Sequence, residues 1–348
     1  MAKRKTFRKV ITSESLIEKI NPKNKALMER FLKNFATKRS PKSVVVYRSN
    51  LNIFFCYCVE NLDNVFFVDL RKSMLLDFFD YCVTTLKWNS ARFSQMHSCL
   101  SSLSTFVEDI YDDVYPNYRN LLPKIEKLPK EFARKKSVFT KEEIDKLMNW
   151  LGEINKPQEQ CLLALMTSSG ARASELARFT TTIIDENNTA FDDLFLETTE
   201  EVKIKGRGIN AKSKLRYILK DSFIPYYHKW LPIREQIMKE NGKEHDYIFI
   251  NQFGEPATDS TFRGWIEKWD NVLDKHFYIH SMRHYFCSEM LRTGVSADFV
   301  KEIIAWESSD MVDVYNDLTV KERTFKGLDK LKESLEKDKE DKEDNINI

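Results

Sequence analysis

Three short segments in the second half of the chain hold side chains that could act together on a phosphodiester. Their candidate functional residues, in chain order, are Arg172, His280, Arg283, Trp306 and Tyr315. A tyrosine hydroxyl can attack phosphorus, arginine forks can bind the charged phosphate oxygens, and histidine can donate or relay a proton. Acidic clusters at metal-ligand spacing and Walker-type glycine-rich loops are both missing from the sequence, so it predicts neither a metal nor another cofactor. The set predicts metal-free transesterification at a phosphodiester.

Taken singly, each of these residues has an ordinary structural explanation. A lone tyrosine or tryptophan is usually a ring of the core or the surface. Arg172 and Glu175 stand three residues apart, which is the spacing of a simple ion pair on a helix. The functional interpretation therefore depends on order and spacing. Arg283 precedes Trp306 by 23 residues, and Tyr315 follows Trp306 by nine.

In this order, the segments resemble the motifs of the tyrosine recombinase (phage integrase-like) family. The matching residues are Arg172 and Glu175 for its T-G-x-R-x-x-E-L motif, His280 and Arg283 for H-x-x-R, Ile304-Ala305-Trp306 for L-G-H, and Tyr315 for the nucleophile. The resemblance spans about residues 20–325. It implies a mainly α fold with a small β-hairpin or sheet, in which an N-terminal four-helix core-binding (SAM-like) domain precedes a C-terminal catalytic domain.

The resemblance also implies a role for each residue. Tyr315 would attack the scissile phosphate and leave a 3′-phosphotyrosyl link and a free 5′-hydroxyl. The residues that hold the phosphate would be Arg172, His280, Arg283 and Trp306, with Glu175 and His284 orienting them. A second 5′-hydroxyl would reverse the step, so no ATP and no metal is implied. The implied partners are double-stranded DNA with specific recombination sites and a homo-tetramer on that DNA, with accessory DNA-bending proteins as further candidates.

A lysine in a β-hairpin completes the family's active site as proton donor to the leaving 5′-oxygen. We assign Lys212, which stands in the expected turn, and keep Lys205 as the alternative. Trp306 replaces the family's histidine and can donate a hydrogen bond but cannot relay a proton, so proton donation is left to the lysine. The 40 residues from Arg172 to Lys212 exceed the family's usual gap, and the acidic residues 185–201 are expected to be an insertion.

Helical periodicity dominates the first half of the chain. Apolar residues recur at helix spacing over about residues 21–35, 41–61, 71–86 and 90–110. These segments predict a four-helix DNA-binding domain over residues 21–122, preceded by a flexible basic arm over residues 1–20. Residues 123–138 are expected to be a basic linker that lies along a DNA backbone, although an ordinary polar linker would have the same composition. The DNA-binding residues expected there are Lys124, Lys127, Lys130, Arg134, Lys135 and Lys136.

The second half is expected to form a catalytic domain over residues 139–325, followed by a charged tail over residues 326–348. Thr140 and Glu143 fit a capping box at the start of its first helix. Two strands, at residues 202–204 and 215–219, are expected to pair as the hairpin. Further elements are expected over residues 157–167, 258–273, 281–291 and 298–304 as helices and over residues 247–250 as a strand.

Composition favours a polyanion partner and excludes several classes of protein. The 348 residues carry a net charge of only +2, but residues 1–136 hold 25 Lys and Arg against 14 Asp and Glu. Apolar runs do not approach the length of a membrane span, and the basic N-terminus lacks the pattern of a secretory signal, so the expected location is the cytoplasm. The six cysteines lack metal-site spacing and are expected to be buried thiols.

The leading hypothesis is a site-specific DNA recombinase or integrase of a phage or other mobile element. A type IB topoisomerase-like enzyme would use the same chemistry, but the separate first domain and the C-terminal tail argue against it. A non-catalytic DNA-binding protein on the same scaffold is the alternative of another class. The joint presence of Arg172, His280, Arg283 and Tyr315 argues against that alternative.

Overall fold

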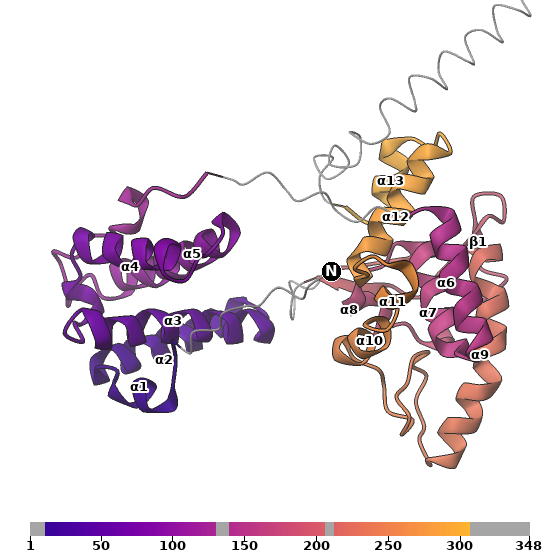
Figure 1. Ribbon diagram of the computed structural model, residues 1–348, viewed down its shortest axis with the longest axis horizontal. Coiled ribbons are helices and arrows are strands. Elements are labelled where there is room, and N and C mark those ends of the chain that lie inside the picture. The colour runs from indigo at the N-terminus through magenta and orange to yellow at the C-terminus, as the bar shows by residue number, and fades with distance from the viewer. Residues whose placement is uncertain (1–10, 130–138, 206–211, 307–348) are drawn as a thin grey trace, which may run out of the picture. The chain divides into compact units, whose positions relative to one another are not determined.

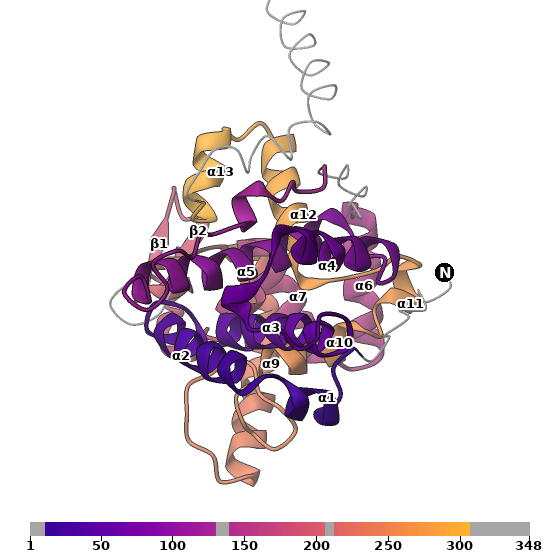
Figure 2. The same cartoon turned by 90° about the vertical axis from the view of Figure 1, so that its left-hand side faces the viewer.

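The structure is a computed structural model that describes residues 11–129, 139–205 and 212–306. The described residues fall into two compact units, the first over residues 11–129 and the second over residues 139–205 and 212–306. Figure 1 labels the α-helices of both units and strand β1, and Figure 2 also labels strand β2. Within the described ranges, no helix combines the length and the apolar character needed to cross a bilayer.

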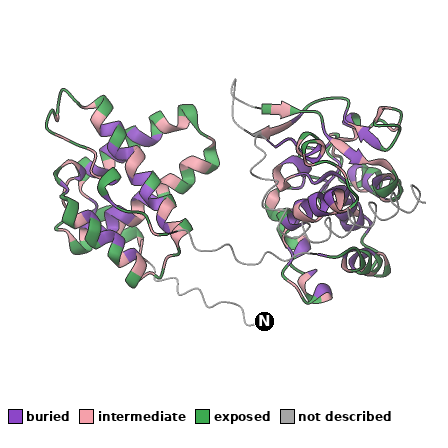
Figure 3. Ribbon diagram, turned by 90° about the horizontal axis from the view of Figure 1, so that it is seen from above, coloured by how far each residue is buried: buried purple, intermediate pink, exposed green. Residues whose placement is uncertain are grey.

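The first unit is helical. Its elements are α1 (Glu14–Lys19), α2 (Pro22–Lys38), α3 (Pro41–Asn61), η1 (Phe67–Asp69), α4 (Lys72–Thr84), α5 (Ser90–Ile110) and η2 (Leu122–Lys124). Asn21 and Ser40 cap α2 and α3 with their side chains, and a proline at the first turn of each helix presets the backbone. The apolar faces of these helices meet in a core rich in aromatic rings, such as Phe54 and Phe78 at 4.9 Å between centroids. Figure 3 shows this buried interior between exposed outer faces.

Both ends of the first unit differ from the prediction. The flexible arm expected over residues 1–20 is wrong in its second half, because Ser13 caps α1 and Ile20 is buried in the core. The linker expected from residue 123 is also wrong at its start, because Ile125 packs into the same core. Residues 1–10 and 130–138 lie outside the described part of the chain.

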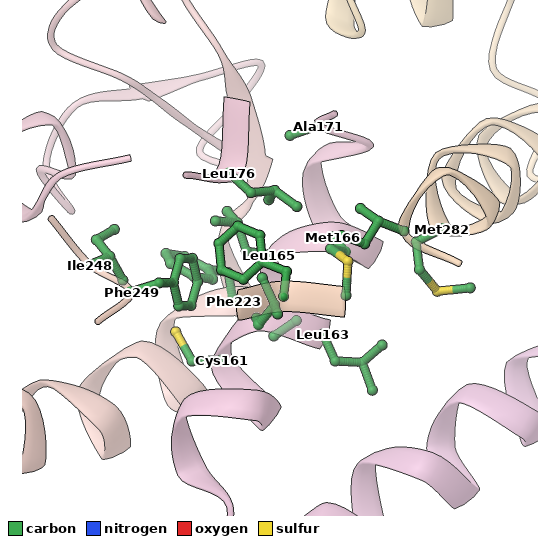
Figure 4. Close-up of a cluster of buried hydrophobic side chains, with 14 of the residues drawn as sticks. Cys161, Leu163, Leu165, Met166, Ala171, Leu176, Phe223, Ile248, Phe249 and Met282 are labelled. Atoms are coloured by element: carbon green, nitrogen blue, oxygen red, sulfur yellow. The ribbon is translucent and has the colours of Figure 1, made fainter. Parts of the chain in front are cut away.

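The second unit is built around one buried helix. Its helices are α6 (Lys141–Glu153), α7 (Pro157–Ser169), α8 (Ala173–Leu176), η3 (Thr181–Ile183), α9 (Lys220–Glu240), α10 (Asp259–Ile266), α11 (Asp270–Leu273), α12 (Ile279–Arg292) and α13 (Ala297–Ile303). Eleven of the thirteen residues of α7 are buried, so this helix is apolar on nearly all sides, as a central helix must be. It contacts α6, α9 and α12, and Figure 4 shows its side chains Cys161, Leu165 and Met166 in the core.

Two small antiparallel sheets complete the second unit. The first has the order β1 (Thr189–Ala190), β2 (Phe195–Glu197), β5 (Tyr217–Leu219), and the second pairs β3 (Val202–Lys205) with β4 (Lys212–Lys214). The hairpin expected between residues 202–204 and 215–219 is therefore wrong in its pairing, because β5 pairs with β2 instead. The acidic segment 185–201, expected to be an insertion, contributes β2 as the central strand of its sheet and buries Phe195 and Leu196.

The prediction of a mainly helical chain with a little β-structure is confirmed. The Thr140–Glu143 capping box is present at the start of α6. The helix expected over residues 258–273 is broken into α10 and α11, and the strand expected at residues 247–250 forms only isolated bridges. Helix α9 was not predicted, although its 21 residues make it as long as α3 and α5, and no other described helix is longer. Its two internal prolines, Pro225 and Pro232, are typical of loops and ends of helices, so the sequence did not indicate a helix there.

Candidate active site

A left-handed turn at Gly170 places the first arginine. Helix α7 ends at Ser169, and Gly170 adopts φ +57°, which an L-residue rarely tolerates. A Cβ atom on Gly170 would lie 2.8 Å from Cδ1 of Phe286 and 3.2 Å from Cγ2 of Ile304. The bare glycine therefore lets the turn lie directly against α12 and the end of α13, and Arg172 follows as the N-cap of α8.

Arg283 joins all three sequence segments. Its side chain, 1% exposed, reaches from α12 and donates to the carbonyl of Gly170 through Nη1 and to that of Ile304 through Nη2, both at 2.8 Å. Its guanidinium also lies 5.5 Å from the ring centroid of Trp306. Burial, followed by the charges of Arg172 and Arg216, lowers the pKa of Arg283 to about 10. The site thus gathers positive charge in a poorly solvated place.

Arg172 is held by Glu175 but stays accessible. Its Nη1 donates to Oε1 of Glu175 at 2.8 Å, and its backbone N–H donates to Oε2 at 3.3 Å. The Glu175 side chain is fully buried, whereas that of Arg172 is 35% exposed. A buried carboxylate thus fixes an arginine that is still partly exposed, which is the arrangement expected of a phosphate-binding residue.

Helix α12 carries both candidate histidines, and Trp306 follows the end of α13. His280 and His284 stand one turn apart on α12, with ring centroids 5.0 Å apart in an edge-to-face contact. His280 is exposed and His284 half-buried. Trp306 is buried just after α13. The structure therefore brings Arg172, Arg283 and Trp306 together around the Gly170 turn, with His280 on the helix that carries Arg283.

Sequence reasoning missed Arg216. This residue is fully buried between β4 and β5, with Nε 3.6 Å from Oε2 of Glu175 and Nη2 donating to the carbonyl of Ser169 at 3.3 Å. The available signal was the alternation of the strand, which places Arg216 and the buried Ile218 on one face. Arg216 makes Glu175 the shared partner of two arginines.

The hairpin lysines lie at facing positions. In the β3–β4 pair, Lys205 stands opposite Lys212, and α8 contacts β3. Lys212 is exposed and begins β4, so it is not in the turn where it was expected. Lys214 pairs with Glu302 at 3.6 Å. Because Lys205 and Lys212 share one end of the hairpin, the choice between them stays a prediction.

Several predicted residues lie outside the described ranges. These are Tyr315, Lys130, Arg134, Lys135, Lys136 and the tail over residues 326–348. Lys124 and Lys127 are described and exposed on the first unit. All six cysteines are buried free thiols. Where the structure describes the chain, His, Cys, Asp and Glu side chains form no group of three that could hold a metal.

Comparison with known proteins identifies the family. A sequence model of the phage integrase family matches residues 137–322, more than half of the chain. The chain belongs to the phage integrase family. A tyrosine recombinase XerC of Lacticaseibacillus casei is 26% identical over 81% of this chain and 89% of its own length. Family membership confirms the predicted tyrosine recombinase resemblance.

Solved structures of this kind share the fold. A XerH site-specific recombinase bound to palindromic difH substrate aligns with a TM-score of 0.62 and 16% identity, over 89% of this chain and 97% of that one. A lambda integrase tetramer bound to a Holliday junction aligns with a TM-score of 0.61 and 15% identity, over 83% and 76% of the two chains. These likenesses support the mainly helical architecture with small sheets.

Within this member of the phage integrase family, Ala305 occupies the glycine position of the L-G-H segment. It adopts φ +54° and ends α13 in a Schellman motif. The backbone N–H of Ala305 donates to the carbonyl of Glu302, and the backbone N–H of Trp306 donates to the carbonyl of Lys301, both at 3.0 Å. A Cβ atom is unfavourable in this conformation. The residue that places Trp306 is therefore strained.

We expect Ala305→Gly to raise the free energy of unfolding by about 0.5–1 kcal/mol, because glycine relieves the left-handed strain. Thermal unfolding of the purified protein measures this as a higher Tm. Ala297→Gly, the same change at a helical position of α13, should lower the Tm instead. A lower Tm for Ala305→Gly would contradict the strain argument.

Proposed function

We propose that the protein is a site-specific DNA recombinase that breaks and rejoins strands through a 3′-phosphotyrosyl intermediate. The observation that carries the proposal is the convergence of Arg172, Arg283 and Trp306, with the shared carboxylate Glu175, at the Gly170 turn. The site holds three arginines, including Arg216, and only one carboxylate, Glu175, so these groups carry excess positive charge. Such a site favours binding of a negatively charged phosphodiester. Membership in the phage integrase family supports the same reaction.

The proposed step needs only side chains of the protein. The Tyr315 hydroxyl releases its proton to solvent as its oxygen attacks phosphorus, the bond from phosphorus to the 5′-oxygen breaks, and Lys212 gives that oxygen a proton; the resealing step returns both protons. Arg172 and Arg283 stabilise the negative charge that grows on the non-bridging oxygens, and Trp306 donates a further hydrogen bond. A 5′-hydroxyl of another strand then attacks the phosphotyrosine and restores the tyrosine. One phosphodiester is exchanged for another, so the steps balance without ATP.

The partners proposed are double-stranded DNA with specific sites and further copies of the chain. The lambda integrase structure is a tetramer on a Holliday junction, which supports a tetramer here as a proposal. A Tn1549 transposon integrase bound to circular-intermediate DNA also shares the fold, which supports a mobile-element context. Exposed Lys124 and Lys127 would contribute phosphate contacts from the first unit.

The proposal is tested by covalent trapping on DNA. The probe is a library of duplexes with randomised sequence and 5′-bridging phosphorothiolates, because the released thiol cannot efficiently reverse cleavage. We expect a denaturation-resistant protein–DNA adduct whose sequencing reveals the site, and no adduct from Tyr315→Phe. DNA binding by both proteins without any adduct would contradict the proposal and favour a non-catalytic DNA-binding protein.

The lysine assignment predicts a dependence on the leaving group. Lys212→Ala should slow cleavage of the trapped site with its natural 5′-oxygen by about 100-fold or more, because the leaving oxygen loses its proton donor. A 5′-sulfur leaving group needs little protonation and should restore the rate. Gel assays of adduct formation on both substrates measure the effect, with Lys214→Ala as the control. If Lys205→Ala shows this rescue and Lys212→Ala does not, Lys205 is the donor.

A further inference from the structure

Glu175 lies between two arginines that differ in exposure. Arg172 donates to its Oε1 at 2.8 Å and keeps a third of its side chain in solvent, whereas the guanidinium of Arg216 is fully buried. Nε of Arg216 lies 3.6 Å from the other carboxylate oxygen, Oε2. The carboxylate therefore divides its charge between an arginine that faces solvent and one that does not.

The position of Arg216 is fixed from two sides. Its backbone N–H donates to Oγ1 of Thr198 at 3.0 Å, and its carbonyl accepts from the backbone N–H of Thr198 at 2.9 Å. Its Nη2 donates to the carbonyl of Ser169, next to the Gly170 turn. Arg216 thus ties the strand that follows β4 to the turn that precedes Arg172, and its side chain has little freedom to leave Glu175.

From this geometry we infer that Arg216 is a positioning residue for strand cleavage, which frees positive charge on Arg172 by sharing Glu175. The inference rests on the proposed function. With Glu175 alone, Arg172 would form a neutral ion pair and attract a phosphate weakly. With Arg216 added, the three groups carry a net charge of +1, and Arg283 raises the total to +2. A phosphodiester carries −1 and its pentacoordinate transition state −2, so this charge favours the transition state.

Stability alone gives little reason to bury Arg216. Burial lowers its pKa in spite of the opposing charge of Glu175, so the charged form is unfavourable in this position. Replacing a buried ion pair with apolar side chains is often neutral or stabilising. A structural role predicts equal losses on all substrates, whereas the charge-sharing role predicts losses that depend on the charge of the scissile phosphate.

The test compares Arg216→Met and Arg216→Lys on the trapped DNA site. We expect Arg216→Met to cleave about 100-fold more slowly with DNA affinity changed less than about threefold, and Arg216→Lys to recover most of the rate. On a methylphosphonate, which lacks one charged non-bridging oxygen, the Met variant should lose less than about tenfold, since less charge develops. In a Glu175→Gln background, where the carboxylate no longer neutralises Arg172, the effect of Arg216→Met should shrink to about threefold.

The outcomes separate the inference from the proposed function. Failure of the wild-type protein to form an adduct overturns the function itself. Two results would overturn the inference alone, provided that the wild-type protein cleaves. One is an unchanged cleavage rate in Arg216→Met, and the other is an equal loss of cleavage rate on the phosphate and methylphosphonate substrates. If Arg216→Met does not fold, Arg216→Gln takes its place beside Arg216→Lys. A Lys variant no faster than the Gln variant would then also overturn the inference.

Discussion

Arg283→Met is expected to lower the rate of strand cleavage by about 10³-fold or more while changing the stability of the fold by no more than about 3 kcal/mol. The activity falls because the side chain touches both other site segments and would bind the scissile phosphate. Loss of one preorganised charged donor is typically among the largest single effects in such a site. The rate of adduct formation on the trapped site measures the loss.

The small change in stability follows from two opposing terms. The lowered pKa means that charged Arg283 is less favourable in the folded than in the unfolded protein, by roughly 3 kcal/mol, at all pH values below about 10. Its removal relieves that penalty but leaves the carbonyls of Gly170 and Ile304 without their donor, at roughly 1–3 kcal/mol each. The proposed function, and not stability, thus accounts for the burial of Arg283.

Arg234 provides a matched control for this prediction. It is a buried arginine on α9 that also donates to two backbone carbonyls, those of His245 and Tyr247, and it pairs in addition with the exposed carboxylate of Glu235. Arg234→Met should therefore destabilise the fold by about 2 kcal/mol or more and leave the cleavage rate of the folded protein unchanged. Equal cleavage rates for Arg283→Met and wild type, or a stability loss in Arg283→Met matching that in Arg234→Met, would contradict the argument.

The sequence predicted the elements whose pattern is local. The helices over residues 41–61 and 90–110 were predicted with the observed bounds, because their capping residues and their apolar spacing are local features of the sequence. Helix α9 was missed because Pro225 and Pro232 normally end helices, and only packing against α7 compensates for the lost hydrogen bonds. The partner of β5 was wrong for a similar reason, since β2 lies about 20 residues upstream in an acidic segment.

The site shows the same division. Arg172, His280, Arg283 and Trp306 were predicted because their spacing is a motif, and the structure places Arg283 against Trp306 and against the Gly170 turn that leads to Arg172. Arg216 belongs to no motif, and its importance comes from a pairing with Glu175, 41 residues earlier in the chain, that only the fold creates. The hydrogen bonds of Arg283 to two backbone carbonyls were likewise invisible, because any residue type can supply a carbonyl.

Gly170→Ala is expected to destabilise the second unit by about 2–4 kcal/mol and to slow cleavage by about 100-fold in the molecules that stay folded. The left-handed φ of +57° accounts for roughly 1–2 kcal/mol. The remainder comes from the Cβ contact with the Phe286 ring at 2.8 Å, which buried neighbours cannot easily relieve. The rate falls because the displaced turn carries the carbonyl that holds Arg283 and leads directly into Arg172.

Gly242→Ala separates the two contributions to this loss of stability, the backbone strain and the steric contact of the Cβ atom. Gly242 has nearly the same backbone conformation, φ +59°, and nothing lies within 4 Å of the position of its Cβ. Its substitution should therefore show only the conformational term, about 1–2 kcal/mol, and no change in cleavage. The double substitution Gly170→Ala with Phe286→Leu should lose less stability than the sum of the single changes, because the smaller side chain makes room for the Cβ. Equal Tm losses in Gly170→Ala and Gly242→Ala, or strict additivity with Phe286→Leu, would show that the close approach of α12 does not hold the turn in place.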